Sequence, residues 1–221
     1  MFKKIYMLFK IARKLATSGA TSSIFEIYSP PFIIKALFFI IGFNFNEKRN
    51  ENNQSPGEKL CNALQGMGTT FIKLGQFLAT RPDIIGQDIS KELEKLQDKL
   101  PAFSLSEAKN ILKKELGNEN FNQITNISDP VAAASIAQVH FATIVSSNQK
   151  KDIAIKILRP NIEKIFNEEI DALMFLAYIV ENLIKKTKRL KLIEAVQLLR
   201  EITNIEMNLR FEAAAANELY E

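Results

Sequence analysis

The sequence contains one cysteine and one histidine, and this scarcity excludes two kinds of site. Cys61 has no second cysteine with which to form an internal disulfide, which fits a reducing compartment. A metal centre built from cysteine and histidine needs several such residues at set spacings, which this sequence does not offer. We therefore expect no metal site, a core position for Cys61 and a hydrogen bond within a strand for His140.

The sequence also lacks an apolar run long enough to cross a membrane. The segment from Pro30 to Phe45 is strongly apolar, but Lys35 interrupts it and it is shorter than the roughly 20 residues that a spanning helix needs. We expect a buried or interfacial helix there. It is followed by a polar stretch, residues 46–54, that has no apolar period and is predicted to be a linker.

Residues 1–16 lack the continuous apolar centre of a secretory signal, because lysines interrupt it. Their apolar side chains recur at helical spacing, with basic residues mostly on the opposite side, which predicts a basic amphipathic helix. Two interpretations stay open. The helix lies on an anionic membrane surface, or it packs against its own domain.

A large excess of charge is absent as well. The net charge is +4 and the isoelectric point is about 9.0, so binding to nucleic acid is not indicated. With 221 residues, 47% of them hydrophobic, the chain can form one or two domains with a sizeable core. We expect three segments: N-terminal helices in residues 1–46, a helical region in 47–118, and a region of strands and helices in 119–221.

Capping signals place the helices of the middle segment. Ser55 is followed by proline at the first helical position and by Glu58, which together form a capping box, and Ser104 with Glu107 repeats the pattern. Pro101 stops one helix and Gly117 closes another. The expected helices cover residues 55–81, 88–100, 104–117, 161–187 and 190–219.

Three short β-rich segments, residues 121–127, 136–144 and 152–158, predict an antiparallel meander. Alternation in the third strand puts Ala154 and Lys156 on the face opposite the isoleucines. A lysine on a half-buried face needs a carboxylate or a bound anion as its partner, unless its stem is buried and its head reaches solvent.

Two glutamates of the last predicted helix are candidate partners for lysines. Glu206 and Glu212 lie about 120° apart around the helix axis, so they cannot serve one lysine from one face. Lys156 and Lys73 are available as separate partners. The alternative for each glutamate is an ordinary solvated helix charge.

Gly75 stands inside an otherwise sound helix, where glycine costs about 1 kcal/mol relative to alanine. A glycine there is explained if another group approaches Gly75 closely. Two interpretations stay open: the helix packs tightly against a neighbouring helix, or it lies across a ligand pocket with Lys73 and Gln76 as its polar tips.

The segment from Pro130 to Pro160 reads like the phosphate-binding hairpin of a protein kinase in which alanines replace the glycines. Ala132, Ala133, Ala134 and Ser135 form the loop. Lys156, in Ile155-Lys-Ile-Leu-Arg-Pro160, takes the place of the kinase lysine that pairs with the nucleotide phosphates.

Further motifs, in chain order, extend this likeness beyond the hairpin. They are Lys73-Leu-Gly-Gln76, Thr80-Arg-Pro-Asp83, Leu93-Glu-Lys-Leu-Gln-Asp98 and Ala132-Ala-Ala-Ser-Ile-Ala-Gln-Val-His140. Over roughly residues 20–221 the chain resembles the UbiB family, the atypical kinase-like proteins of ubiquinone biosynthesis. The resemblance implies an α+β fold: a kinase-like small lobe, with a partial antiparallel sheet, preceded by a helical extension, the large lobe being missing.

The resemblance also implies roles for single residues. An ATP site would be formed by the loop residues Ala132, Ala133, Ala134 and Ser135 together with Ala154, Lys156 and Glu212. A regulatory or occluding set would comprise Lys73, Gly75, Gln76, Glu206 and Asn208. Asn208 stands where mitochondrial relatives usually have aspartate, so an acid–base or metal role there is in doubt.

Phosphoryl transfer needs a catalytic-loop aspartate, an asparagine and a metal-binding aspartate, none of which has a counterpart before Glu221. By the resemblance, the chain is the N-terminal portion of a UbiB-type protein, with no complete catalytic set, and a C-terminal half would supply the Mg²⁺ ligands. The chain alone is expected to bind nucleotide weakly and to show no ATP turnover.

Three hypotheses for function follow. The first is a UbiB-type protein that supports ubiquinone synthesis, working with a complementary C-terminal fragment and other ubiquinone-biosynthesis proteins. The second is a non-enzymatic remnant that acts as a membrane-surface or partner-binding helical fragment. The third, which is weaker, is an accessory to the polyprenylphenol hydroxylation step. The expected location is peripheral, on the cytoplasmic face of the bacterial inner membrane.

Overall fold

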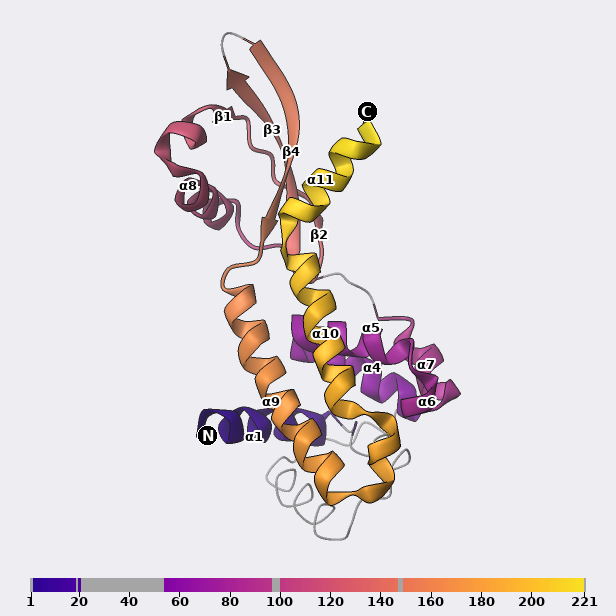
Figure 1. Ribbon diagram of the computed structural model, residues 1–221. Helices are drawn as coiled ribbons and strands as arrows, with labels where there is room; N and C mark the ends of the chain where they lie inside the picture. The colour runs from indigo at the N-terminus through magenta and orange to yellow at the C-terminus, as the bar shows by residue number, and fades with distance from the viewer. Residues whose placement is uncertain (1, 19, 21–53, 97–99, 147–148, 221) are drawn as a thin grey trace. The chain divides into compact units, whose positions relative to one another are not determined.

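The structure, a computed structural model, describes residues 2–18, 20, 54–96, 100–146 and 149–220 (Figure 1). The apolar segment from Pro30 to Phe45 and the linker lie outside the described residues. Two compact units are present. Unit 1 comprises Met1–Gln97 and Ile165–Asn204, and unit 2 comprises Asp98–Lys164 and Ile205–Glu221. The division into three segments that was expected from the sequence is not tested by these two units and stays a prediction.

Two helices replace the single one expected after Ser55. Helix α4 (Pro56–Met67) begins with the predicted capping box: Ser55 Oγ accepts from the Glu58 N–H at 3.2 Å, and Glu58 Oε2 accepts from the Ser55 N–H at 2.8 Å. Gly68 then breaks the helix with a φ of 105°, which glycine tolerates, and α5 (Thr69–Ala79) follows. The apolar period of the sequence did not reveal this break because it continues across Gly68.

The core of unit 1 lies among α4, α5 and α7 (Gln87–Leu93), with α6 (Pro82–Ile85) beside α7. Its buried side chains include Leu64, Ile72 and Leu93. Cys61 is also buried, and burial raises the pKa of its thiol, which agrees with a core position. The helix expected over residues 88–100 is shorter than predicted, because α7 ends at Leu93.

Helix α1 (Phe2–Thr17) confirms the amphipathic helix predicted at the N-terminus. Ile11 is buried and α1 contacts α4, whereas Phe2, Tyr6 and Phe9 are exposed. The helix therefore has two apolar sides, one buried at Ile11 and one exposed at Phe2, Tyr6 and Phe9. Among the described residues, no helix is long and apolar enough to span a membrane.

The long helical stretches after Pro160 are α9 (Ile162–Leu183), a 3₁₀ turn η1 (Lys185–Leu190), α10 (Leu192–Met207) and α11 (Leu209–Tyr220). A single helix over 190–219 was expected, so this prediction was wrong at Asn208. The Asn208 Oδ1 accepts from the Arg210 N–H at 3.3 Å, so its side chain competes with a continuous helical backbone. The break puts Glu212 in the first turn of α11, where a carboxylate is favoured by the helix dipole.

Unit 2 contains an antiparallel sheet of four strands among the described residues (Figure 1). Strand β3 (Ala137–Ser146) is central and pairs along its whole length with β4 (Gln149–Leu158). The short strands β1 (Ile124–Thr125) and β2 (Pro130–Ala133) pair with the other edge of β3. The meander predicted from the sequence therefore missed β2, whose alanine-rich sequence has little β-propensity.

Helix α8 (Leu105–Asn122) covers one face of this sheet. Ser104 Oγ accepts from the Glu107 N–H at 3.2 Å, which is the predicted cap, but the helix continues past Gly117, where a φ of 76° kinks it. Ala108 and Leu112 pack against Ile157 of β4. The isoleucine face of β4 is thus the buried face, and Lys156 lies on the opposite face, as the alternation of side chains predicted. The α+β class with a small antiparallel sheet and helices is confirmed.

Candidate functional site

An ion pair between β4 and α11 lies at the centre of the candidate site. Lys156 Nζ is 2.8 Å from Glu212 Oε1 and 2.6 Å from Oε2. The side chains of Lys156 and Glu212 are 34% and 56% exposed. A pair this open to water adds only about 0–1 kcal/mol to stability, so stability alone is a weak reason for it.

The sheet face around this pair is open. In the β3–β4 register Val139 lies opposite Lys156, and Phe141 lies opposite Ala154. Phe141 is exposed, and a hollow of about 450 Å³ is lined by Phe141, Ala154 and Asp152 among others. The strand alternation predicted the place of Ala154, but Val139 and Phe141 were not singled out from the sequence, although Val139 follows the alanines at the spacing of the kinase motif's valine.

The alanine-rich loop joins β2 to β3. Ala132 and Ala133 belong to β2, and the Ala134 N–H donates to the Ala137 carbonyl at 2.8 Å to close the turn. Ser135 is buried. The loop has no residue with positive φ, the conformation for which glycine is required, and this is why alanines fit it.

Arg159, directly after β4, is a further residue of this region that the sequence reasoning missed. Its guanidinium donates four hydrogen bonds to main-chain carbonyls: from Nε and Nη2 to Ala134 at 3.0 and 2.8 Å, from Nη1 to Pro101 at 3.0 Å, and from Nη2 to Leu100 at 3.2 Å. Its only signal in the sequence is an arginine that ends an apolar strand, before Pro160.

A buried polar network supports the sheet from the α8 side. Gln138 Oε1 accepts from the Phe103 N–H at 2.9 Å, and Gln138 Nε2 donates to the Phe103 carbonyl at 3.1 Å. The same Nε2 is 2.8 Å from His140 Nε2, and His140 Nδ1 is 2.8 Å from the Ser128 carbonyl. The carbonyl accepts only, so Nδ1 carries the hydrogen and His140 Nε2 accepts from Gln138. His140 thus has the hydrogen-bonding role expected of it.

The residues predicted to occlude the site belong to two different units. Lys73, Gly75 and Gln76 are on α5 in unit 1, where Gly75 is buried and the other two are half-buried. Glu206, in the last turn of α10, and Asn208 belong to unit 2. The two groups of residues belong to separate units, and the occluding role stays a prediction.

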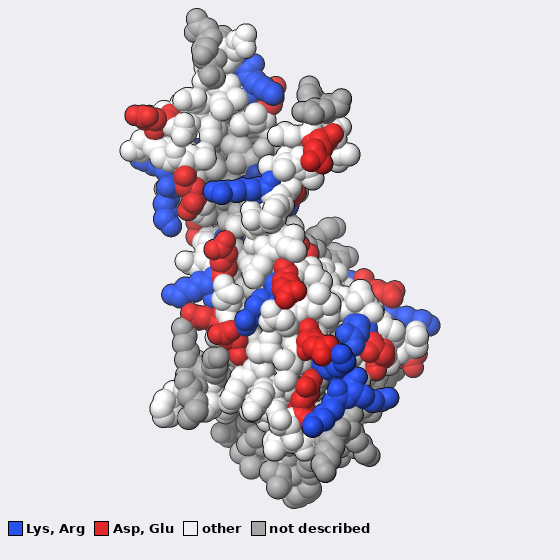
Figure 2. All heavy atoms as spheres, viewed as in Figure 1, with Lys and Arg blue, Asp and Glu red and all other residues white. Residues whose placement is uncertain are grey.

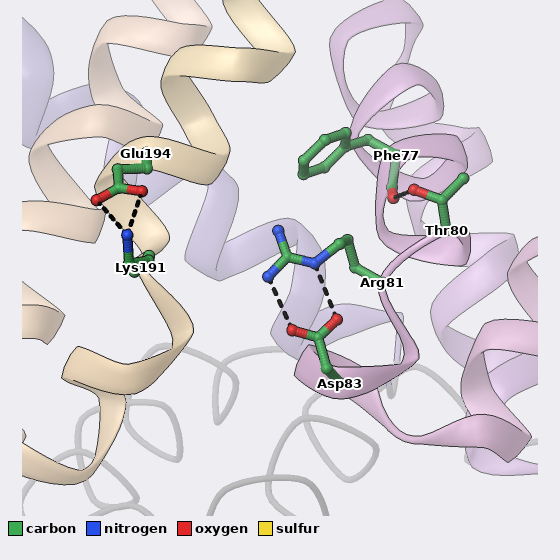
Figure 3. Close-up of polar contacts among 6 residues, drawn as sticks. All are labelled: Phe77, Thr80, Arg81, Asp83, Lys191 and Glu194. Atoms are coloured by element: carbon green, nitrogen blue, oxygen red, sulfur yellow. Dashed lines mark hydrogen bonds and ion pairs between the residues drawn. The ribbon is translucent and has the colours of Figure 1, made fainter.

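The Thr80-to-Asp83 motif forms the hydrogen-bonded turn from α5 into α6 (Figure 3). Thr80 Oγ1 donates to the Phe77 carbonyl at 2.8 Å, and Arg81 Nε and Nη2 each lie 2.8 Å from an Asp83 oxygen. The hydrogen bonds from the Arg81 guanidinium hold the pKa of the Asp83 carboxyl below its ordinary value. The turn borders a hollow of about 650 Å³ in unit 1, which Arg189 also lines. The motif is explained by local structure.

The charged side chains visible in Figure 2 do not gather by sign into a further site. Basic and acidic side chains are interspersed over the face shown in Figure 2, in keeping with the mild net charge of +4. Among the described residues, no three histidine, cysteine or acidic side chains gather as metal ligands would.

Comparison with known proteins gives one family and many relatives. The model of the ABC1 atypical kinase-like domain matches residues 95–221. A probable protein kinase UbiB of Marinobacter nauticus is 36% identical over 166 residues, covering 75% of this chain and 30% of the relative. Those of Shewanella baltica (36% over 178 residues, 77% and 31%) and Tolumonas auensis (37% over 172 residues, 75% and 30%) are similar. No solved structure matches.

The chain spans about 30% of the length of the curated relatives it matches. The matched domain includes the alanine-rich loop, Lys156 and Glu212, but not Lys73 or Gln76.

Proposed function

The chain belongs to the ABC1 atypical kinase-like family, and we propose that unit 2 forms the nucleotide side of a kinase-like small lobe that binds ATP and supports ubiquinone biosynthesis. The observation that carries the proposal is the Lys156–Glu212 pair, with Nζ 2.6 and 2.8 Å from the two carboxylate oxygens. In protein kinases a strand lysine is held by a helix glutamate in this way while it contacts the nucleotide phosphates.

The residues present fit such a ligand. An ammonium has three donors, and Glu212 accepts from Lys156 at two oxygens, so the head group can be held in place and still meet an anion. Ala154 and Phe141 line an open hollow on the same sheet face, where a base would find apolar contact. ATP would supply the phosphoryl group. We propose that Mg²⁺ would be held outside the described residues, and that the chain works with a complementary C-terminal part and other ubiquinone-biosynthesis proteins.

Replacement of Lys156 tests the ATP site. Lys156→Ala is expected to weaken ATP binding by about 10- to 100-fold, the value of one hydrogen bond to a charged group. Equilibrium dialysis with millimolar ATP measures it. Lys151→Ala is the matched control, because Lys151 is an exposed lysine of the same strand. Equal affinities for ATP in Lys156→Ala and the unmodified chain would refute the site.

A second candidate function concerns α1. We propose that its outer side docks on an anionic membrane, which would make the protein peripheral on the cytoplasmic face of the bacterial inner membrane. The supporting observation is an apolar stripe at helical spacing, in which Phe2, Tyr6 and Phe9 are 87%, 68% and 49% exposed. Lys10 and Arg13 are exposed on the same helix and would meet lipid phosphates. This role does not need the ATP site, so it would also suit a non-enzymatic remnant.

Sedimentation with lipid vesicles tests the membrane proposal. The chain should bind vesicles that contain phosphatidylglycerol, and the double variant Tyr6→Ser, Phe9→Ser should bind at least about tenfold more weakly, because each buried aromatic contributes about 1.5–3 kcal/mol. Tyr178→Ser removes an aromatic of similar exposure from α9 and serves as the control. If both variants bind as the unmodified chain does, α1 is not the membrane contact.

A further inference from the structure

Arg159 binds the alanine-rich loop through both its side chain and its main chain. The guanidinium Nε and Nη2 lie 3.0 and 2.8 Å from the Ala134 carbonyl, and the Arg159 N–H donates to the Ile136 carbonyl at 2.9 Å. The remaining guanidinium bonds reach the carbonyls of Leu100 and Pro101 at 3.2 and 3.0 Å. One residue thus joins the end of β4 to the loop and to the segment before α8.

The β2–β3 pairing and one turn hydrogen bond also hold the loop. Within the turn, the Ala134 N–H donates to the Ala137 carbonyl at 2.8 Å. Alanine side chains offer no polar group, whereas Arg159 presents a planar fork that holds a carbonyl with little loss of freedom. Ser135, Ile136 and Ala137 are all buried, so the loop tip is packed.

We propose that Arg159 is a positioning residue of the ATP site, acting through the Ala134 carbonyl. Lys156 lies on β4, three positions before Arg159, which directly follows the strand, so a loop fixed to Arg159 is also fixed relative to the Lys156 ammonium. A nucleotide then meets a loop that is already ordered, and its binding does not bear the entropic cost of ordering it. This inference rests on the ATP site proposed above.

The role is positioning because the guanidinium donors point to carbonyls. All four described bonds of the Arg159 side chain end on main-chain oxygens of residues 100, 101 and 134. Its contribution to nucleotide affinity should therefore depend on geometry, and a lysine, which is a point charge without the fork, should restore it only in part.

Two measurements on the full 221-residue chain test the inference, with Arg159→Gln and Arg159→Lys as variants. In Arg159→Gln, the Ala134 amide should exchange its hydrogen about tenfold faster, while amides of α8 and mid-β4 keep their rates. ATP affinity by equilibrium dialysis should fall about tenfold, with Arg159→Lys between the two. Arg210→Gln, an exposed arginine of the same unit, should change neither.

The outcomes separate this inference from the function on which it rests. Uniformly faster exchange across unit 2 would mean that Arg159 only stabilises the fold and would overturn the positioning role. An unchanged Ala134 rate, or an unchanged ATP affinity despite a faster rate, would overturn it as well. The ATP site itself would be refuted if the unmodified chain does not bind ATP, or if Lys156→Ala binds ATP with the same affinity. The nucleotide part of the inference would then be refuted with it. The exchange rates would still report whether Arg159 holds the loop.

Discussion

Gln138→Leu is expected to lower the free energy of unfolding of unit 2 by about 3–5 kcal/mol, because it leaves three polar groups without their partner at about 1–3 kcal/mol for each that stays dry. Gln138 is 1% exposed. Its amide accepts from the Phe103 N–H at 2.9 Å, donates to the Phe103 carbonyl at 3.1 Å and donates to His140 Nε2. Leucine fills a similar volume but can make none of these bonds.

The position of His140 explains why the loss is not easily repaired. His140 is fully buried, and its Nδ1 hydrogen is already used on the Ser128 carbonyl at 2.8 Å. Its Nε2 lone pair therefore needs a donor, and Gln138 Nε2 is the donor that the structure provides. A buried network is strong when complete and costly when broken, so Gln138→Leu should act on Phe103, before α8, and on β3 together.

Urea unfolding, monitored by the hydrogen exchange of backbone amides in unit 2, measures this loss of stability. Gln123→Leu is the matched control, since Gln123 is exposed in the same unit and should change stability by about 0.5 kcal/mol or less. A loss below about 1 kcal/mol in Gln138→Leu would mean that water replaces the missing amide.

The parts of the fold that the sequence predicted are those with local causes. The capping boxes predicted at Ser55 and Ser104 depend on residues three positions away. The full box is present at Ser55, and at Ser104 the serine half is present, in which Oγ accepts from the Glu107 N–H. Alternation along β4 predicted which face of the strand carries Lys156. Chemistry left a carboxylate or a bound anion as the partner of that lysine, and the resemblance pointed to Glu212. The structure brings Glu212 to Lys156, although nucleotide binding by the pair stays a prediction.

The parts that were missed depend on contacts distant in the sequence or on single backbone angles. Gly68 and Asn208 interrupt apolar periods that run on unchanged, so periodicity alone joined the helices on either side. Strand β2 exists because β3 offers it an edge, despite its alanines. Gln138 and Arg159 look like ordinary strand and turn residues until Phe103 and Ala134 are brought beside them.

Gly75 and Gly66 should respond to the same substitution with opposite signs. An alanine Cβ at Gly75 would overlap Leu96 Cδ1 and lie 3.0 Å from Leu64 Cδ1, whereas at Gly66, on exposed α4 surface, nothing lies within 4 Å. Overpacking a core costs about 1–3 kcal/mol, and exchanging glycine for alanine in a helix gains about 0.5–1 kcal/mol. Gly75→Ala is thus expected to destabilise unit 1 and Gly66→Ala to stabilise it. Both glycines are helical, so the helix gain applies to each variant and the two should differ by the overpacking cost, about 1–3 kcal/mol.

This pair of variants also separates the two explanations of Gly75 within a helix. The structure shows tight packing between α5 and the leucines at positions 64 and 96, and packing predicts a loss of stability for Gly75→Ala that is present without any ligand. An occluding role instead predicts that Gly75→Ala changes the affinity for ATP while the stability of unit 1 stays the same. Urea unfolding of unit 1, beside ATP dialysis of the same variants, distinguishes them: a stable Gly75→Ala chain with altered ATP affinity would contradict the packing explanation, because the overlap with Leu96 must be relieved whether or not ATP is bound.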